Sequence, residues 1–262
     1  MSRSNRVMII GTSVVAAAVL ALTGYAALSG DDDSAASGKD GKDKASASPS
    51  DSGPGYNPPD QWSEPKKWAA LPRGRKTDDH GNEVGFPHTT NGAVAMLAAS
   101  NQTEVKGGRS MVDERMAQYD SYLSATDQSP ENKEKIKAEA VQTDASMRKK
   151  MGIRGTGDLP SGAYMRSTTV GFKVIESSQD EVSVYLLSRV TMKAGEIEKE
   201  QGSRARNILG AEWDDKAKDW KLSTAASVRA GQQAQSEEPP AIVAPGDAKF
   251  NAAGWTAIRQ AS

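Results

Sequence analysis

Two histidines are the side chains of this 262-residue sequence best suited to acid–base or metal chemistry. His80 ends "TDDH", where Asp78 and Asp79 could help it hold a divalent ion weakly, although a solvated loop is the favoured interpretation. His88 lies in "GFPHTTNGAVAMLAAS", directly before an apolar run. Catalysis would need a nucleophile beside one of them, yet no Gly-x-Ser-x-Gly elbow occurs. We therefore expect no catalytic residue, no bound metal and no enzymatic activity.

A glycine-rich stretch offers a second kind of chemistry, the binding of a dinucleotide. In "GIRGTGDLPSG", Gly155 and Gly157 could begin the phosphate-binding fingerprint. The third glycine would fall on Pro160, and the stretch follows a predicted helix where the fingerprint requires a strand. The pattern therefore predicts no cofactor.

Charge and cysteine content exclude further classes of function. The 33 basic and 34 acidic residues give a formal net charge of −1, so no chain-wide positive field favours nucleic acid. The absence of cysteine excludes disulfides, thiolate zinc sites and a cysteine-anchored lipoprotein. The basic group Arg148, Lys149, Lys150 and Arg154 could contact an acidic partner or an anionic cell-wall polymer.

The N-terminal residues predict attachment to a membrane. Residues 7–28 carry no charge, and as a helix they would be about 33 Å long, which matches a hydrocarbon core of about 30 Å. Arg3 and Arg6 precede this run and Asp31 follows it closely, so the positive-inside rule predicts a cytoplasmic segment 1–6 and an extracytoplasmic remainder. The alternative is a signal peptide that is cleaved near Ser29, which would release the protein.

Two polar or irregular segments follow the apolar run. Residues 29–61 are rich in Ser, Gly, Asp and Lys, and this composition predicts a disordered linker. Residues 62–87 contain Trp62, Trp68, Pro65 and Pro72, which favours an extended arm that lies on the next domain, with partner binding as the alternative.

An α+β domain is predicted at residues 88–227, and its first part reads as three helices. Thr89 or Thr90 can cap a helix that begins near Asn91, and Ser110 with Asp113 can cap a second. Ser129 and Pro130 suit the start of a third helix, which would end at Gly152.

The apolar period then changes to two, which is typical of strands. Val170, Phe172 and Val174 alternate with polar residues, and a second alternating run follows the turn "SSQD". A further hairpin is expected to turn at "DDKAKD". Three helices followed by four strands predict helices packed on one face of a curved, four-stranded antiparallel sheet.

The C-terminal part divides into two segments. Residues 228–249 are predicted to form a flexible tail because they are rich in Ala, Gln, Glu and Pro. Residues 250–262 place Phe250, Gly254, Trp255 and Ile258 at nearly helical spacing. This short segment could dock on the domain, bind a partner or stay unstructured.

The order of membrane span, tether, helices and strands resembles the cystatin-like, nuclear-transport-factor-like cone fold. It is similar in particular to the single-span scaffold subunits of type IV secretion and conjugation machinery. "GFPHTTNGAVAMLAAS" with the later "EWDDKAKDWKL" also resembles uncharacterised membrane proteins encoded on actinobacterial mobile elements. The resemblance covers roughly residues 68–226 and implies a non-catalytic domain that packs against copies of itself or other subunits outside the membrane.

We accordingly predict a membrane-anchored extracytoplasmic scaffold or interaction protein, part of a conjugative-transfer or secretion apparatus. Two alternatives stay open: a small-molecule-binding or enzymatic cone domain, and a cell-wall-associated protein. His88 is interpreted as a residue of the capping region that precedes the first helix.

Overall fold

The computed structural model describes residues 62–259. The predicted membrane helix at 7–28, the linker at 29–61 and the cleavage site near Ser29 lie outside this range. Between residues 62 and 259, no helix is long and apolar enough to cross a bilayer.

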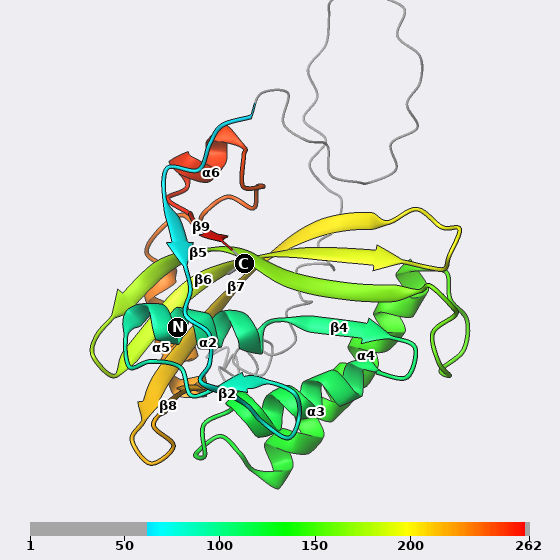
Figure 1. Ribbon diagram of the computed structural model, residues 1–262, viewed down its shortest axis with the longest axis horizontal. Coiled ribbons are helices and arrows are strands. Elements are labelled where there is room, and N and C mark those ends of the chain that lie inside the picture. Colours follow the sequence, from blue (N-terminus) through cyan, green and yellow to red (C-terminus); the bar gives the residue numbers. More distant parts are fainter. Residues whose placement is uncertain (1–61, 260–262) are drawn as a thin grey trace, which may run out of the picture.

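The described chain forms one large sheet with helices on both of its faces (Figure 1). The strands are β1 (Trp68–Ala70), β2 (Lys76–Thr77), β3 (Glu83–Val84), β4 (Thr103–Lys106), β5 (Tyr164–Ser177), β6 (Glu181–Lys193), β7 (Gln201–Asp214), β8 (Asp219–Leu222) and β9 (Thr256–Arg259). The helices are α2 (Thr90–Ser100), α3 (Met111–Tyr122), α4 (Pro130–Lys150), α5 (Thr224–Ala234) and α6 (Ala248–Ala252). β2 and β3 form a separate two-stranded sheet.

Three long antiparallel strands, β5, β6 and β7, make the centre of the sheet. Phe172 lies opposite Leu186, and Val184 lies opposite Leu209, so apolar side chains share one face. Register shifts at Thr169/Gly171 and Val174/Glu176 interrupt β5. Such bulges bend a strand and increase its twist. The two hairpins that the period-two patterns predicted are present, as β5–β6 and β7–β8.

The predicted four-stranded antiparallel sheet is nevertheless wrong, although the α+β class is right. The sheet has seven strands in the order β1-β9-β5-β6-β7-β8, with β4 also paired to β5, and β1 runs parallel to β9. The three additional strands, β1, β4 and β9, have only three or four residues each. Runs this short are too brief for an alternating pattern to reveal.

The three predicted helix starts are confirmed. Thr89 accepts a hydrogen bond from the Gly92 amide at the start of α2. Ser110 and Asp113 form a reciprocal capping box on α3, and Ser129 caps α4, which has Pro130 in its first turn. Because these polar side chains satisfy amides that the helix leaves unbonded, short local patterns were sufficient to locate the ends.

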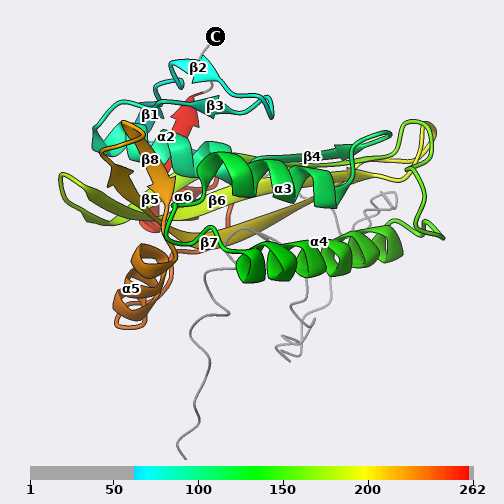
Figure 2. The same cartoon turned by 90° about the horizontal axis from the view of Figure 1, so that it is seen from below.

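One face of the sheet carries α2, α3 and α4 and two apolar clusters. The larger cluster joins α2 to β6, β7 and β8 and includes Phe172 and Leu186, with Trp213 packed at its margin. The second cluster joins Met147 of α4 to Val190 and Met192 at the far end of β6. In Figure 2, α3 and α4 run side by side along this face.

The opposite face is covered by α5 and by the C-terminal segment. Tyr185 and Leu187 of β6 pack there against Phe250 and Trp255. Residues of the predicted flexible tail take part in this layer, because α5 extends to Ala234 and the Trp255 indole donates a 2.8 Å hydrogen bond to the Ala241 carbonyl. The C-terminal segment that begins at Phe250 therefore docks on the domain.

The predicted arm and the C-terminal segment meet at the edge of the sheet. β1 of the arm pairs with β9, and the Ser63 amide donates to the Gly246 carbonyl at 2.8 Å. The helical spacing expected at 250–262 ends early because Gly254 has a φ of +78°, after which Thr256–Arg259 is a strand. Both ends of the described chain are thus fixed to one another.

Candidate functional site

His88, the strongest candidate of the sequence, is part of an aromatic corner formed by His88, Trp213 and Trp220. Its imidazole stacks on Trp213 with ring centroids 3.9 Å apart and planes 6° from parallel, and it meets the edge of Trp220 at 5.5 Å. The Nε2 atom lies 2.9 Å from the carboxylate of Asp180. The stacked ring and this carboxylate hold the imidazole as a packed, oriented side chain.

Buried hydrogen bonds hold this corner together. The Trp220 indole donates to the Pro87 carbonyl at 2.9 Å, and the Phe86 amide donates to the Asp219 carboxylate at 2.8 Å. Trp220, Phe86 and Asp219 are all buried. The residues around "GFPH" therefore connect the arm to the β7–β8 hairpin, and His88 helps to build that junction.

The "TDDH" loop is a turn. One Asp78 oxygen accepts hydrogen bonds from the amides of His80 and Asn82, at 3.0 and 2.9 Å. Burial opposes ionisation of Asp78, but the Ser121 hydroxyl and these two amides outweigh it, so the pKa of Asp78 lies below its usual value. Among residues 62–259, no three histidine or acidic side chains gather into a metal-binding group.

The predicted basic group is divided by the fold. Arg148 is buried, and it donates to Asp144 and to the Gly157 carbonyl at 2.6 Å each. Lys149, Lys150 and Arg154 are exposed. Gly155 and Gly157 lie in the irregular loop that follows α4.

The structure reveals a polar groove that the sequence did not predict. β4 and β9 pair with the same edge of β5. Along β5, the pairing with β4 ends at Ser167 and the pairing with β9 begins at Gly171. Among residues 62–259, no strand pairs with residues 168–170 of β5 on this edge. A groove of about 730 Å³ lies over it, between β4, the arm and the end of β9.

Charged side chains line this groove, and three of its basic residues form ion pairs with Glu104 or Glu114. Its basic residues are Arg73, Lys106, Arg109, Arg166 and Arg259, and its acidic residues are Glu83, Glu104 and Glu114. The wall therefore has more positive than negative charge. Such an excess favours an acidic ligand.

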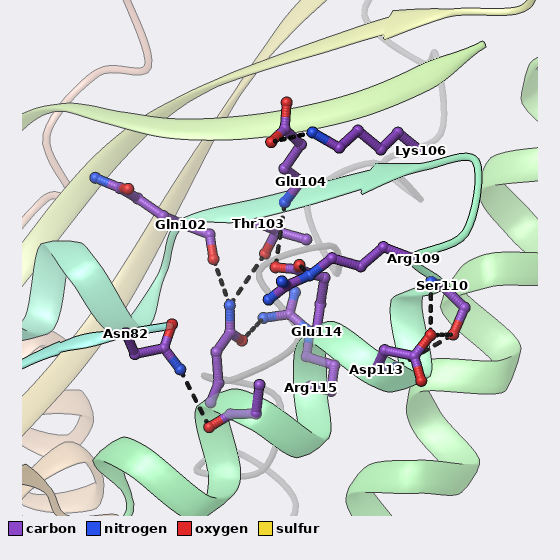
Figure 3. A network of polar contacts seen from close by, with 12 residues as sticks. Asn82, Gln102, Thr103, Glu104, Lys106, Arg109, Ser110, Asp113, Glu114 and Arg115 are labelled. Carbon is purple, nitrogen blue, oxygen red and sulfur yellow. Dashed lines mark hydrogen bonds and ion pairs between the residues drawn. The ribbon is translucent and has the colours of Figure 1, made fainter. Parts of the chain in front are cut away.

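Glu114 of α3 anchors one wall of the groove (Figure 3). Its side chain is 8% exposed, and it forms an ion pair with Arg109 and accepts a 3.2 Å hydrogen bond from the Glu104 amide. A carboxylate that is held by a guanidinium and an amide keeps a fixed direction. Glu114 thereby ties α3 to β4.

Glu104 organises the outer rim in the same way. It accepts hydrogen bonds from Arg166 of β5 at 2.7 Å and from Lys106 at 3.2 Å. The Arg166 hydrogen bond, followed by that from Lys106, holds the pKa of Glu104 below its usual value of 4.5 despite partial burial. At neutral pH the Glu104 side chain is thus ionised, and its ion pair with Arg166 joins β4 to β5.

A buried polar layer supports the groove from below. Arg115 donates to Gln118 at 2.6 Å, and Gln118 in turn donates to the Gln102 carbonyl, the residue that precedes β4. Burial lowers the pKa of Arg115 to about 10. Local sequence gave no signal for this arrangement, because the groove takes residues from β4, β5, β9, α3 and the arm.

No protein-family model, curated protein or solved structure matches this chain, so the geometry of its own residues carries the functional argument.

Proposed function

We propose that the protein is a non-catalytic, membrane-tethered interaction protein whose polar groove binds an acidic, extended segment of another subunit. The observation that carries this proposal is the interrupted edge of β5, where Thr168 and Thr169 lie in the wall of a groove lined by arginines. Extended peptides bind such edges through main-chain hydrogen bonds, and side chains of the groove add specificity.

The arrangement of charge supports a protein ligand in preference to a reaction. The groove's carboxylates Glu104 and Glu114 are each held by basic side chains. Their role in this geometry is to fix the direction of Arg109 and Arg166. An oriented guanidinium loses little freedom when it binds a further carboxylate, because planar donors are already in place.

The membrane location and the secretion or conjugation setting belong to this proposal and rest on the apolar segment 7–28, the polar linker and the resemblance to single-span scaffold subunits. The fixed junction between β1 and β9 is consistent with a domain held by a tether, since a pull on the arm is transmitted directly to the sheet.

Charge reversal at the groove tests the proposal. The full-length chain is purified from its native membranes as wild type and as Arg166→Glu, and the partners retained after chemical cross-linking are quantified. Arg229→Glu is the matched control, because Arg229 has a similar exposure and is likewise held by carboxylates, but lies on α5. We expect Arg166→Glu alone to reduce partner recovery at least ~10-fold, a loss of about 1.4 kcal/mol.

Equal recovery with both variants would contradict the groove as the binding surface. A wild-type protein that stays monomeric and retains no partner would contradict the interaction function itself.

A further inference from the structure

Another recess lies on the face of the sheet that carries α5 and the C-terminal segment, and we call it the arginine notch. It has a volume of about 460 Å³, and its walls include Val170, Arg189, Gly202, Arg204, Ala244 and Pro245. None of the residues that line it also lines the groove. Small-molecule sites have volumes of about 300–1,000 Å³, so the notch is large enough to hold a small ligand.

The register of the sheet places two arginines side by side in the notch. Arg189 of β6 lies directly opposite Arg204 of β7. Side chains at such positions are close neighbours, and like charges placed there destabilise a sheet. An anion bound between the two guanidiniums would remove this repulsion. The arginine pair is therefore the feature of the notch that indicates a ligand.

The residues that line the notch have more positive than negative charge. Glu200 is the acidic residue among them, and it accepts a hydrogen bond from Arg189 at 3.5 Å, longer than most bonds between charged groups. Because side chains of a strand alternate between its faces, Lys193 of β6 and Arg206 of β7 lie on the same face as the pair. Such an excess favours an anionic ligand.

Two neighbouring guanidiniums favour a phosphate monoester over a carboxylate. Each guanidinium presents a planar fork of N–H donors, and one fork is enough to hold both oxygens of a carboxylate. A phosphate monoester has three terminal oxygens and can accept from both forks at once. Val170, Ala244 and Pro245 give the notch an apolar side, which suits a short carbon chain on the ester oxygen.

The notch is open to solvent. Arg189 is exposed and Arg204 is half-buried, so a ligand can reach both guanidiniums. Gly202 lies two residues before Arg204 on the same face of β7, and a Cβ atom there would meet nothing within 4 Å. A side chain introduced at Gly202 would therefore enter the notch without a clash.

We propose that the arginine notch binds a small phosphate monoester. The phosphate oxygens accept hydrogen bonds from Arg189 and Arg204, and the carbon chain lies against the apolar side. This site does not depend on the proposed interaction function, because it has no lining residue in common with the groove.

Equilibrium dialysis tests the site in the full-length protein, held in a non-ionic detergent. The probe is radiolabelled n-butyl phosphate, and the comparison ligands are pentanoate, which carries a carboxylate, and butyl methyl phosphate, which has one terminal oxygen fewer. We expect n-butyl phosphate to bind at least ~10-fold more tightly than either, because only this ligand offers three terminal oxygens to the two guanidiniums.

A first pair of variants tests the position of the ligand. Gly202→Glu places a carboxylate in the notch and should reduce the affinity for n-butyl phosphate at least ~10-fold. Gln201→Glu adds the same charge at the preceding residue, whose side chain is on the other face of β7, and should not reduce it.

A second pair tests the arginines. Arg189→Gln removes one guanidinium of the pair and should reduce the affinity at least ~10-fold. Arg229→Gln is the matched control, since Arg229 is also exposed and held by glutamates but lies on α5, and it should bind as the wild type does.

Competition by lipid distinguishes two sources of the phosphate. Phosphatidic acid is added to the detergent micelles, with phosphatidylcholine as its control. Displacement of n-butyl phosphate by phosphatidic acid alone supports a site that accepts a lipid head group, and no displacement supports a site for soluble esters.

The proposal is overturned if n-butyl phosphate does not bind, or if pentanoate binds the wild type equally well. It is also overturned if the two variants of either pair behave alike. Should a variant fail to fold, as judged by circular dichroism, the comparison of the three ligands on the wild type decides.

Discussion

The aromatic corner around His88 and the polar groove beside β5 use polar side chains for opposite purposes. In the corner, His88 stacks on Trp213 and Trp220 meets both rings edge-on, and the indole and amide donors end on nearby protein acceptors. In the groove, Arg109 and Arg166 are also paired, yet about half of each side chain stays accessible to solvent. The corner stabilises the fold, and the groove presents charge.

Residue type alone is a poor guide to function in this chain. His88 was a candidate for chemistry in the sequence, and the structure instead places it against Trp213 and Asp180, where it closes a junction. The arginines and glutamates of the groove resemble ordinary surface charge in the sequence. They come together because β4 and β9 share one edge of β5 and α3 packs against β4.

Trp220→Ala should break the corner and have the largest effect. Trp220 is fully buried and bonds the Pro87 carbonyl, so its truncation is expected to cost about 3–5 kcal/mol of stability. Chemical denaturation followed by circular dichroism measures the loss. Trp68→Ala is the control, since Trp68 is 37% exposed, and it should cost about 1 kcal/mol or less. A similar loss in both variants would show that the corner is not a stabilising centre.

Glu114→Gln should weaken the groove's wall. The substitution removes the charge that holds Arg109 in a site where Glu114 is 8% exposed, so we expect a loss of about 2 kcal/mol in stability together with weaker partner binding. The matched change at the rim, Glu104→Gln, should cost less than about 1 kcal/mol because Glu104 is 39% exposed. Equal losses would indicate that burial does not distinguish the two acids.

His88→Ala separates the two regions most cleanly. It removes a stacked ring and the contact with Asp180, so stability should fall by about 1 kcal/mol, while partner binding through the groove should not change. Thermal melts and the cross-linking assay measure both properties. A folded His88→Ala protein that loses partner binding or another measurable activity would show that the aromatic corner, and not the groove, carries the function.

The pH dependence of the rim should be the smallest effect. Because Arg166 lowers the pKa of Glu104 in the folded state, this pair stabilises the protein above the usual carboxyl pKa of 4.5, and the contribution is lost as the pH falls through the lowered value. Carboxyl-carbon NMR titration should show the Glu104 midpoint move upward in Arg166→Gln. An unchanged midpoint would contradict the ion pair.

The sequence predicted those features that depend on neighbouring residues. The caps at Thr89, Ser110 and Ser129 and the two long hairpins were found because their signals lie within a few positions of one another. The short strands β1, β4 and β9 were missed, since each pairs with a strand far away in the sequence. β1 of the arm pairs with β9 of the C-terminal segment, and β4 and β9 both pair with β5. The groove depends on these strands and could not be predicted without them.

Close backbone contacts explain two further choices of residue that the sequence left unexplained. A Cβ atom at Gly92 would lie 1.9 Å from the Pro87 carbonyl oxygen, and one at Gly210 would lie 2.5 Å from the backbone of Ala226. These glycines let α2 start beside the corner and let α5 pack tightly on β7. The need arises from tertiary contacts and not from local conformation.

Site-specific photocross-linking tests the central claim, that the groove is the surface that binds a partner. A photoreactive residue replaces Gln102, an exposed residue of the groove, or Gln232, an exposed glutamine on α5, in the full-length protein within its native membrane. The account predicts a discrete cross-linked partner from position 102 that is absent from position 232 and disappears when Arg166→Glu is added. A cross-link from position 232 alone, or one at 102 that Arg166→Glu leaves unchanged, would contradict it.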